Sequence, residues 1–238
     1  TGSVRVGRIL NGLAGEMLKP ATMELGGHAP VIVFADADLE RAAQMTAAFK
    51  YRNAGQVCLG VSRIFVQEEA YETFLAHFLD QVKAIKVGNG MTEGTTMGPV
   101  ANIRQIAAME HMVEDALESG SQIVHGGARC NDLGYFFEPT VLTEVPDDSV
   151  IMTEEPFGPV VPLAPFATFD EVVARANSLH HAYELLQTGV DQVFRETMDS
   201  ALEMGVEALK VLGFRSYQAH RAARIFKRHE HKAMAELF

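Results

Sequence analysis

Two side chains in the first quarter of the chain have the types and setting needed for covalent chemistry. Cys58 follows the run Asn53-Ala-Gly-Gln-Val, and Glu24 lies beside the glycine pair Gly26 and Gly27. A thiolate is a strong nucleophile, a nearby carboxylate can act as general base, and backbone N–H groups can hold an oxyanion. A lone cysteine can equally be a small hydrophobic side chain packed in a core. Residue types alone leave both interpretations of Cys58 open.

Composition limits the classes of protein to consider. The chain has 238 residues, of which 47% are apolar and 21% are charged, which is enough for one large domain or two small ones. No apolar run approaches the roughly 18–20 residues of a membrane span, and the N-terminus has no signal-peptide pattern. The net charge of −11 argues against a nucleic-acid partner. The chain has only two cysteines, Cys58 and Cys130, too few for a disulfide framework. Because disulfides are typical of oxidising compartments, we expect a cytoplasmic location.

Charge and proline are distributed unevenly along the chain. Residues 1–177 hold 12 Lys and Arg against 23 Asp and Glu, whereas residues 178–238 hold 8 of each. All nine prolines lie at or before Pro165. The composition therefore changes near residue 178, without a Pro/Gly/Ser linker at the join.

Hydrophobic periodicity predicts the elements that must position Glu24 and Cys58. A continuous apolar run predicts a strand over 29–34, and alternation predicts one over 61–67. Another strand is expected from residue 122, followed by strands and turns over 132–165. Helical spacing predicts helices over 4–18, 38–50, 69–85 and 105–119, with another beginning at 169. Strands that alternate with helices predict an α/β fold with a parallel-rich sheet and flanking helices.

The C-terminal region predicts a different structure. Residues 196–212 carry an apolar stripe at helical spacing, Gly213 suits the end of that helix, and a second amphipathic run follows. We expect a C-terminal helical hairpin there. His220, His229 and His231 have no strong zinc-site spacing, so we expect a solvated helix face and no metal.

A series of short motifs resembles the aldehyde dehydrogenase superfamily. They occur in the family's order and spacing over residues 1–177, and as a series they are specific to it. The matching pieces are Thr1-Gly-Ser-Val-Arg-Val-Gly7, Met23-Glu-Leu-Gly-Gly27, Asp36-Ala-Asp-Leu39, Gly55-Gln-Val-Cys58, Met97-Gly-Pro99, Glu138-Pro-Thr140 and Glu154-Glu-Pro-Phe-Gly-Pro159.

The resemblance implies a role for each matching residue. Cys58 matches the nucleophile that attacks an aldehyde to give a thiohemiacetal, which becomes a thioester after hydride transfer to NAD or NADP. Its backbone N–H matches part of the oxyanion hole, and Glu24 matches the general base that activates the hydrolytic water. The cofactor-binding positions of the family fall on Gly2, Ser3 and Gly7, at the pyrophosphate, and on Glu155 and Phe157, at the nicotinamide ribose and ring.

Other parts of the family pattern do not occur in these 238 residues. The Rossmann half that precedes the cofactor-binding turn is missing, together with the asparagine that completes the oxyanion hole, and so are the family's final strands. We therefore expect an incomplete catalytic domain with weak or no aldehyde oxidation, because hydride transfer needs tight positioning.

The remaining residues resemble another family. Residues 178–238 contain His181-Ala-Tyr-Glu-Leu-Leu186 and Gln218-Ala-His-Arg-Ala222, which resemble the end of the cytosolic nucleotide-binding (RCK/KTN) domain of Kef-type potassium–proton antiporters. The chain is therefore expected to combine two incomplete pieces, 1–177 and 178–238, joined near residues 175–181.

Two functions follow from these resemblances. The first is NAD(P)-dependent oxidation of a small aldehyde, with Glu24–Pro30 and Cys58–Arg63 favouring the succinate-semialdehyde type and with the family's homo-oligomer as an assembly. The second is a non-enzymatic regulatory or interaction module, in which the helical tail docks on a transporter domain. A thiol-labelling rate separates them, because an active-site Cys58 should react faster than Cys130.

Overall fold

The computed structural model describes residues 1–130, 133–168, 171–172, 206, 216–218 and 220–225. The chain divides into two compact units, Thr1–Thr168 and Phe169–Phe238, which are described separately. Nearly all described residues belong to the first unit, which contains every position at which the sequence predicts chemistry.

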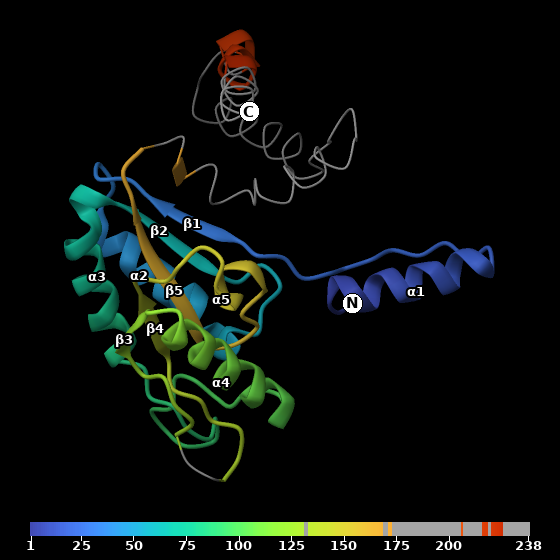
Figure 1. The fold of residues 1–238 in the computed structure, drawn as a ribbon, viewed down its shortest axis with the longest axis horizontal. Helices are drawn as coiled ribbons and strands as arrows, with labels where there is room; N and C mark the ends of the chain where they lie inside the picture. Colours follow the sequence, from blue (N-terminus) through green and yellow to red (C-terminus); the bar gives the residue numbers. More distant parts are fainter. Residues whose placement is uncertain (131–132, 169–170, 173–205, 207–215, 219, 226–238) are drawn as a thin grey trace. The chain divides into compact units, whose positions relative to one another are not determined.

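The first unit alternates strands with helices, as the periodicity predicts. Its helices are α1 (Val4–Glu16), α2 (Leu39–Lys50), the 3₁₀ helix η1 (Arg52–Gly55), α3 (Glu68–Lys83), α4 (Ile103–Glu118) and the short α5 (Val150–Thr153). Its strands are β1 (Pro30–Val33), β2 (Arg63–Gln67), β3 (Gln122–His125), β4 (Thr140–Thr143) and β5 (Val160–Phe166) (Figure 1).

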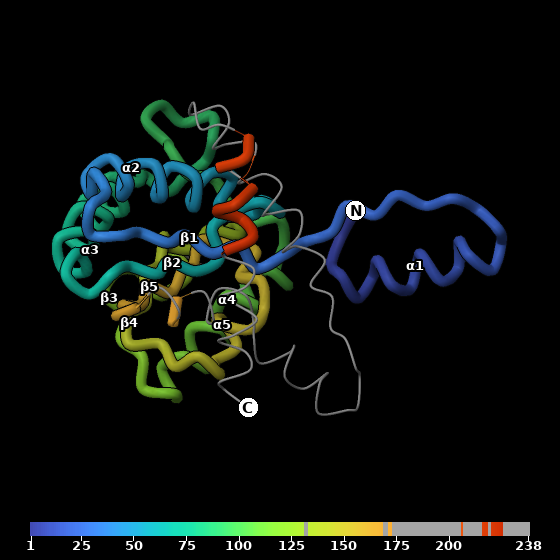
Figure 2. Tube along the Cα trace, turned by 90° about the horizontal axis from the view of Figure 1, so that it is seen from above, coloured from blue at the N-terminus to red at the C-terminus, as the bar shows by residue number. Residues whose placement is uncertain are grey.

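The five strands form one mostly parallel sheet in the order β1-β2-β5-β4-β3. Only β3 pairs antiparallel, with β4, whereas β1–β2, β2–β5 and β4–β5 are parallel. Helices α2 and α3 lie on one face of the sheet, and α4 and α5 lie on the other (Figure 2). The α/β fold with a parallel-rich sheet is confirmed.

Strand β2 is buried on both faces. Its residues Ile64, Phe65 and Val66 have no exposed surface, and its neighbour β5 is buried over most of its length. The sequence pattern of 61–67 alternates like a half-exposed strand, but Arg63 is also buried. Burial on both faces is typical of the interior of a parallel sheet, because crossover helices pack on each side.

Polar side chains cap the helices at their predicted starts. The Ser3 hydroxyl accepts a hydrogen bond from the Val6 N–H at 3.4 Å, and the Asp38 carboxylate accepts one from the Arg41 N–H at 3.1 Å. Such caps satisfy N–H groups that have no partner within the helix. Helix α1 ends at Glu16 rather than at 18, because Leu18 adopts a left-handed φ of 52°.

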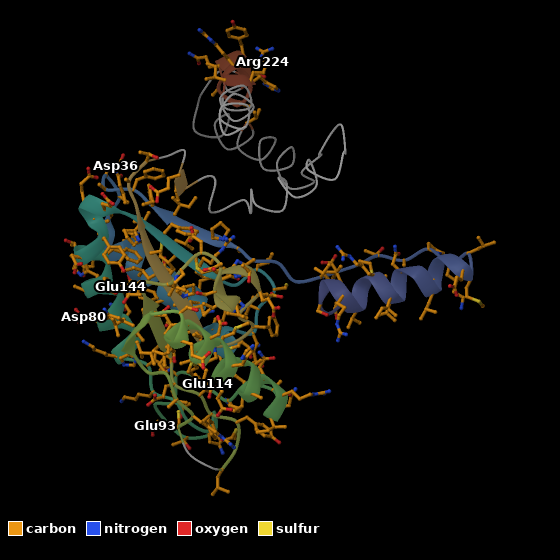
Figure 3. The ribbon with its side chains drawn as sticks, in the orientation of Figure 1. Asp36, Asp80, Glu93, Glu114, Glu144 and Arg224 are labelled. Carbon is orange, nitrogen blue, oxygen red and sulfur yellow. The ribbon has the colours of Figure 1, made fainter. Side chains whose placement is uncertain are left out.

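Acidic side chains lie on the outside of the first unit. Figure 3 labels Asp36, Asp80, Glu93, Glu114 and Glu144, all of which are exposed. Their charge is solvated and costs the fold little. No helix among the described residues is long and apolar enough to cross a membrane.

Most of the second unit lies outside the described residues. The predicted helical hairpin over 196–212 and beyond, and most of the helix expected from 169, fall there. Residues 216–218 and 220–225 are helical, and the His220 ring nitrogen Nδ1 lies 2.7 Å from the Ser216 carbonyl oxygen. The hairpin therefore stays a prediction.

Replacing the central core side chain of β2 should destabilise the first unit strongly. Phe65→Ala should lower the free energy of unfolding by about 3–5 kcal/mol, because it removes a fully buried ring and leaves a cavity. Phe49→Ala, at a ring that is 40% exposed, is the matched control and should cost less than half as much. Urea denaturation of both variants measures the difference, and equal costs would contradict the assignment of β2 as the centre of the core.

Candidate active site

A left-handed turn connects α2 to Cys58. Asn53, Ala54 and Gly55 have φ angles of 52°, 53° and 74°, within or at the end of η1. Two consecutive non-glycine residues in this region are uncommon, and each costs roughly 1 kcal/mol or more. Strain of this kind persists where surrounding contacts hold it, and it often occurs beside functional groups.

Side-chain amides brace this turn. The Asn53 amide donates to the Gln56 carbonyl and the Gln56 amide donates to the Asn53 carbonyl, each at 3.0 Å. The Gln56 side-chain oxygen also accepts a hydrogen bond from the Ala101 N–H at 2.8 Å. These three bonds fix the backbone that leads into Cys58.

Cys58 lies at the tip of a tight turn. The Gly60 N–H donates to the Val57 carbonyl at 2.7 Å, which closes the turn around Cys58 and Leu59. The Cys58 side chain is exposed, so the interpretation as a packed core thiol is wrong. Among the described residues, none accepts a hydrogen bond from the Cys58 N–H, which leaves this donor open beside the sulfur.

The loop that contains Gly158 contacts the turn that leads to Cys58. A Cβ atom at Gly55 would overlap the Gly158 carbonyl, and one at Gly158 would overlap the Met109 side chain on α4. The backbones at 55 and 158 can approach this closely only because neither residue has a side chain. The loop that carries Glu155 and Phe157 is thereby brought beside the turn that carries Cys58.

The Glu24 segment is tied to the start of α1. Gly2 and Leu25 form a parallel bridge, with the Gly2 N–H donating to the Glu24 carbonyl at 3.2 Å and the Gly26 N–H to the Gly2 carbonyl at 3.3 Å. A Cβ atom at Gly7 would overlap the Leu25 side chain. The chain after α1 runs back beside the helix (Figures 1 and 2). Four of the predicted site residues, Gly2, Ser3, Gly7 and Glu24, therefore lie in one substructure.

Glu155 connects this segment to the loop beside Cys58. Its carboxylate rests on Gly26, where a Cβ atom would overlap it, and it accepts a hydrogen bond from the Gly27 N–H. The pKa of Glu155 is raised because burial disfavours the charged form, while the Gly27 N–H and Lys50 oppose that rise.

Phe157 and Glu24 complete the predicted set. Phe157 is half-buried, and its N–H donates to the Glu155 carbonyl at 2.9 Å within the same turn. Glu24 is exposed, and no hydrogen bond joins it to Cys58, both residues being described. Glu24 is therefore positioned for contact with solvent water rather than for direct contact with the thiol.

His28 is held by contacts with α5 and β2. Its Nε2 lies 3.1 Å from the Ile151 carbonyl oxygen, and the Arg63 guanidinium donates to the His28 carbonyl at 2.9 Å. Burial, with Arg63 as a second cause, lowers the pKa of His28 to about 4. The ring is neutral at pH 7, so its Nε2–H donates to Ile151. These contacts give His28 a structural role.

Sequence reasoning missed Lys50. It is the last residue of α2 and is only 1% exposed. Burial lowers its pKa to about 7, opposed by Glu155. The available signal was its register, because Lys50 follows Ala43 and Ala47 on the buried stripe of the helix.

Comparisons with known proteins agree with the motif series. A profile of the aldehyde dehydrogenase family matches residues 1–203, and one of the potassium efflux system KefB C-terminal domain matches residues 200–238. The first match extends past residue 177, the expected end of the first piece.

Curated relatives share substantial identity over part of their length. A 3-sulfolactaldehyde dehydrogenase of Pseudomonas putida is 44% identical over 75% of this chain and 37% of its own length. The NADP(+)-dependent succinate-semialdehyde dehydrogenase GabD of Escherichia coli is 38% identical over 87% of this chain and 43% of its own. The chain thus spans about two fifths of the relatives it matches.

Solved aldehyde dehydrogenase structures match the fold of this chain. The crystal structure of succinate-semialdehyde dehydrogenase from Burkholderia pseudomallei matches with a TM-score of 0.72 and 45% identity. The match covers 74% of this chain and 37% of that one.

Adding a methyl group at Gly55 should disrupt the contact between the two loops. Gly55→Ala should lower the free energy of unfolding by about 2–4 kcal/mol, because it combines a positive φ with overlap against the Gly158 backbone. Gly90→Ala, where a Cβ atom meets nothing within 4 Å, is the control and should be nearly neutral. Thermal denaturation measures both, and a tolerated Gly55→Ala would show that the loops do not touch.

The neutral His28 ring should make stability fall in acid. Its folded pKa of about 4 lies below the ordinary 6.5, so the unfolded chain binds more protons between these values. Stability contributed by His28 is complete above pH 6.5 and is lost as pH falls toward 4, by up to about 1.4 kcal/mol per pH unit.

Comparing variants isolates this contribution in urea denaturation at pH 4–7. His28→Gln keeps an amide donor but does not titrate, so it should flatten the slope. His111→Gln, at an exposed position on α4, should leave it unchanged. An unchanged slope in His28→Gln would contradict the assignment.

Proposed function

Since this chain belongs to the aldehyde dehydrogenase family, we propose that it contributes the catalytic cysteine and general base to NAD(P)-dependent oxidation of an aldehyde to a carboxylic acid. The observation that carries the proposal is the position of Cys58. Its thiol is exposed at the tip of a braced turn that touches the Glu155 loop. Exposure and a fixed backbone suit a nucleophile that must meet a small substrate.

The first chemical step uses Cys58. Its thiolate attacks the aldehyde carbon and forms a C–S bond, and the carbonyl π electrons move to oxygen to give a thiohemiacetal alkoxide. The Cys58 N–H, which no described residue engages, is available to stabilise that alkoxide. Loss of hydride from the same carbon restores the C=O bond and leaves a thioester on Cys58.

Glu24 completes the cycle. As general base, its carboxylate removes a proton from water while the water oxygen attacks the thioester carbon. The C–S bond then breaks, releasing a carboxylic acid and the Cys58 thiolate. The exposure of Glu24 supports this role, because a base that activates water must reach solvent.

The described residues fit a nicotinamide cofactor. The half-buried Glu155 carboxylate, held on Gly26, is an acceptor suited to a ribose diol, and the half-buried Phe157 ring can pack beside the nicotinamide. Gly2, Ser3 and Gly7 lie at the N-terminal end of α1, where backbone N–H groups favour a pyrophosphate. When bound, NAD or NADP supplies the hydride acceptor.

The substrate is proposed to be a small aldehyde with an acidic group. The names of similar proteins support this class, since they include succinate-semialdehyde, glutarate-semialdehyde and 3-sulfolactaldehyde dehydrogenases. Each of these substrate names describes an aldehyde with a carboxylate or sulfonate. The succinate-semialdehyde type inferred from residues 24–30 and 58–63 belongs to the same class.

The C-terminal region supports a second role only through sequence. Residues 200–238 match the KefB C-terminal domain, which favours an interaction module there. All the proposed catalytic residues lie outside that match, so this role is compatible with the first.

Ester hydrolysis tests the cysteine and the base without the cofactor. With p-nitrophenyl acetate, Cys58→Ser should reduce turnover at least about 100-fold, because it removes the nucleophile. Cys130→Ser is the matched control, since Cys130 is the other exposed free cysteine. Glu24→Gln should slow deacylation about 100-fold or more, so that an acetyl adduct accumulates on Cys58 in mass spectrometry. Unchanged hydrolysis in Cys58→Ser would refute the proposal.

A further inference from the structure

Lys50 is a charged residue in an apolar setting. It ends α2, its side chain is 1% exposed, and it shares the buried stripe of the helix with Ala43 and Ala47. Lysine is almost never fully buried without a partner, because the ammonium loses its hydration. The position therefore requires a charge or dipole that faces it.

The carboxylate that acts on Lys50 is Glu155, from the loop after α5. The two groups act on each other electrostatically, and Lys50 also acts on His28. The Glu155 carboxylate is held on a second side by Gly26 and by the Gly27 N–H. The backbone of residues 26–27 contacts the Glu155 carboxylate, and Lys50 from α2 acts on the same carboxylate electrostatically.

We propose that Lys50 is a positioning residue that keeps the Glu155 carboxylate ionised and oriented toward the cofactor. The part of this inference that concerns the cofactor rests on the function proposed above for Glu155. The Lys50–Glu155 interaction itself needs no ligand. Lys50 is buried at the end of α2, and the turn that follows it meets the Glu155 loop where Gly55 lies against Gly158.

The chemistry of a carboxyl group explains why the ammonium matters. An ionised carboxylate only accepts hydrogen bonds, so it can take the Gly27 N–H and two ribose hydroxyls together. A protonated carboxyl group carries a donor and loses part of that capacity. Burial pushes Glu155 toward the protonated form, and Lys50 opposes it. A buried charge whose partner is removed is strongly destabilising, so each group depends on the other.

The first experiment measures the charge state of Glu155 in the full chain. Carbon-detected NMR titration with ¹³C-labelled glutamate, assigned through Glu155→Gln, reports its pKa. Lys50→Met keeps the aliphatic length but removes the charge, and should raise the pKa of Glu155. Lys83→Met is the matched control, because Lys83 also ends a helix, α3, but is exposed. It should leave the pKa unchanged. An unchanged pKa of Glu155 in Lys50→Met would overturn the proposal.

The second experiment follows the Gly27 amide by hydrogen exchange. Its exchange should accelerate about tenfold or more in Lys50→Met, the factor expected when a hydrogen bond to a charged group weakens. Glu155→Gln should accelerate it similarly, and the double variant should show no further acceleration. Multiplicative effects of the two substitutions would mean that Lys50 acts only through packing and would overturn the proposal. If Lys50→Met does not fold, the double variant, which leaves no buried charge at the pair, should fold. Failure of both would also overturn it.

Cofactor binding separates this inference from the function proposed above. Saturation-transfer NMR with nicotinamide mononucleotide should show weaker binding to Lys50→Met and to Glu155→Gln than to Lys83→Met. A changed pKa and amide exchange without any mononucleotide binding would support the Lys50–Glu155 pair and refute the cofactor role of Glu155. An unchanged pKa with normal binding would refute the role of Lys50 alone.

Discussion

The site depends on close contact between backbones at glycine positions. Gly55 meets the backbone of Gly158, and Gly26 supports the carboxylate of Glu155, in both cases at distances that a Cβ atom would prevent. Three segments distant in the chain, around residues 26, 55 and 158, are thereby joined. A thiol, a carboxylate and a backbone donor can act on one small substrate only if such contacts fix their separation.

The sheet places these three segments next to one another. Residues 24–29 lead into β1, the Cys58 turn leads into β2, and the 154–158 loop leads into β5. Because these three strands are parallel neighbours, the segments that precede them reach the same edge of the sheet. Burial of β2 on both faces fixes that edge, since its strand cannot shift without exposing Phe65 and its neighbours.

Several buried polar groups interact with one another in a connected set. The Arg63 guanidinium donates to the His28 carbonyl, the His28 ring bonds the Ile151 carbonyl, and Lys50 interacts electrostatically with Glu155. Each would be costly alone in a poorly hydrated interior, and each is compensated by a specific partner. The set links α2, α5 and the loop after α5, and so couples the sheet to the residues proposed for catalysis.

The sequence by itself determined the fold class and the family. Hydrophobic periodicity located most of the strands and helices of the first unit, because helical and strand spacing are local properties. The motif series around Glu24, Cys58 and Glu155 identified the family, which the profile match to residues 1–203 confirmed. The roles assigned to those residues remain predictions.

Only the tertiary structure decided the environment of each group. Whether Cys58 was buried depended on the left-handed turn at Asn53–Gly55, whose φ angles are stabilised by Gln56 and Gly158, partners that the local pattern does not specify. Lys50 was invisible as a functional candidate because its partner lies 105 positions away, at Glu155. Burial and electrostatic pairing arise from packing between distant segments, whereas periodicity and motifs are properties of neighbouring residues, and this physical difference set the limit of prediction.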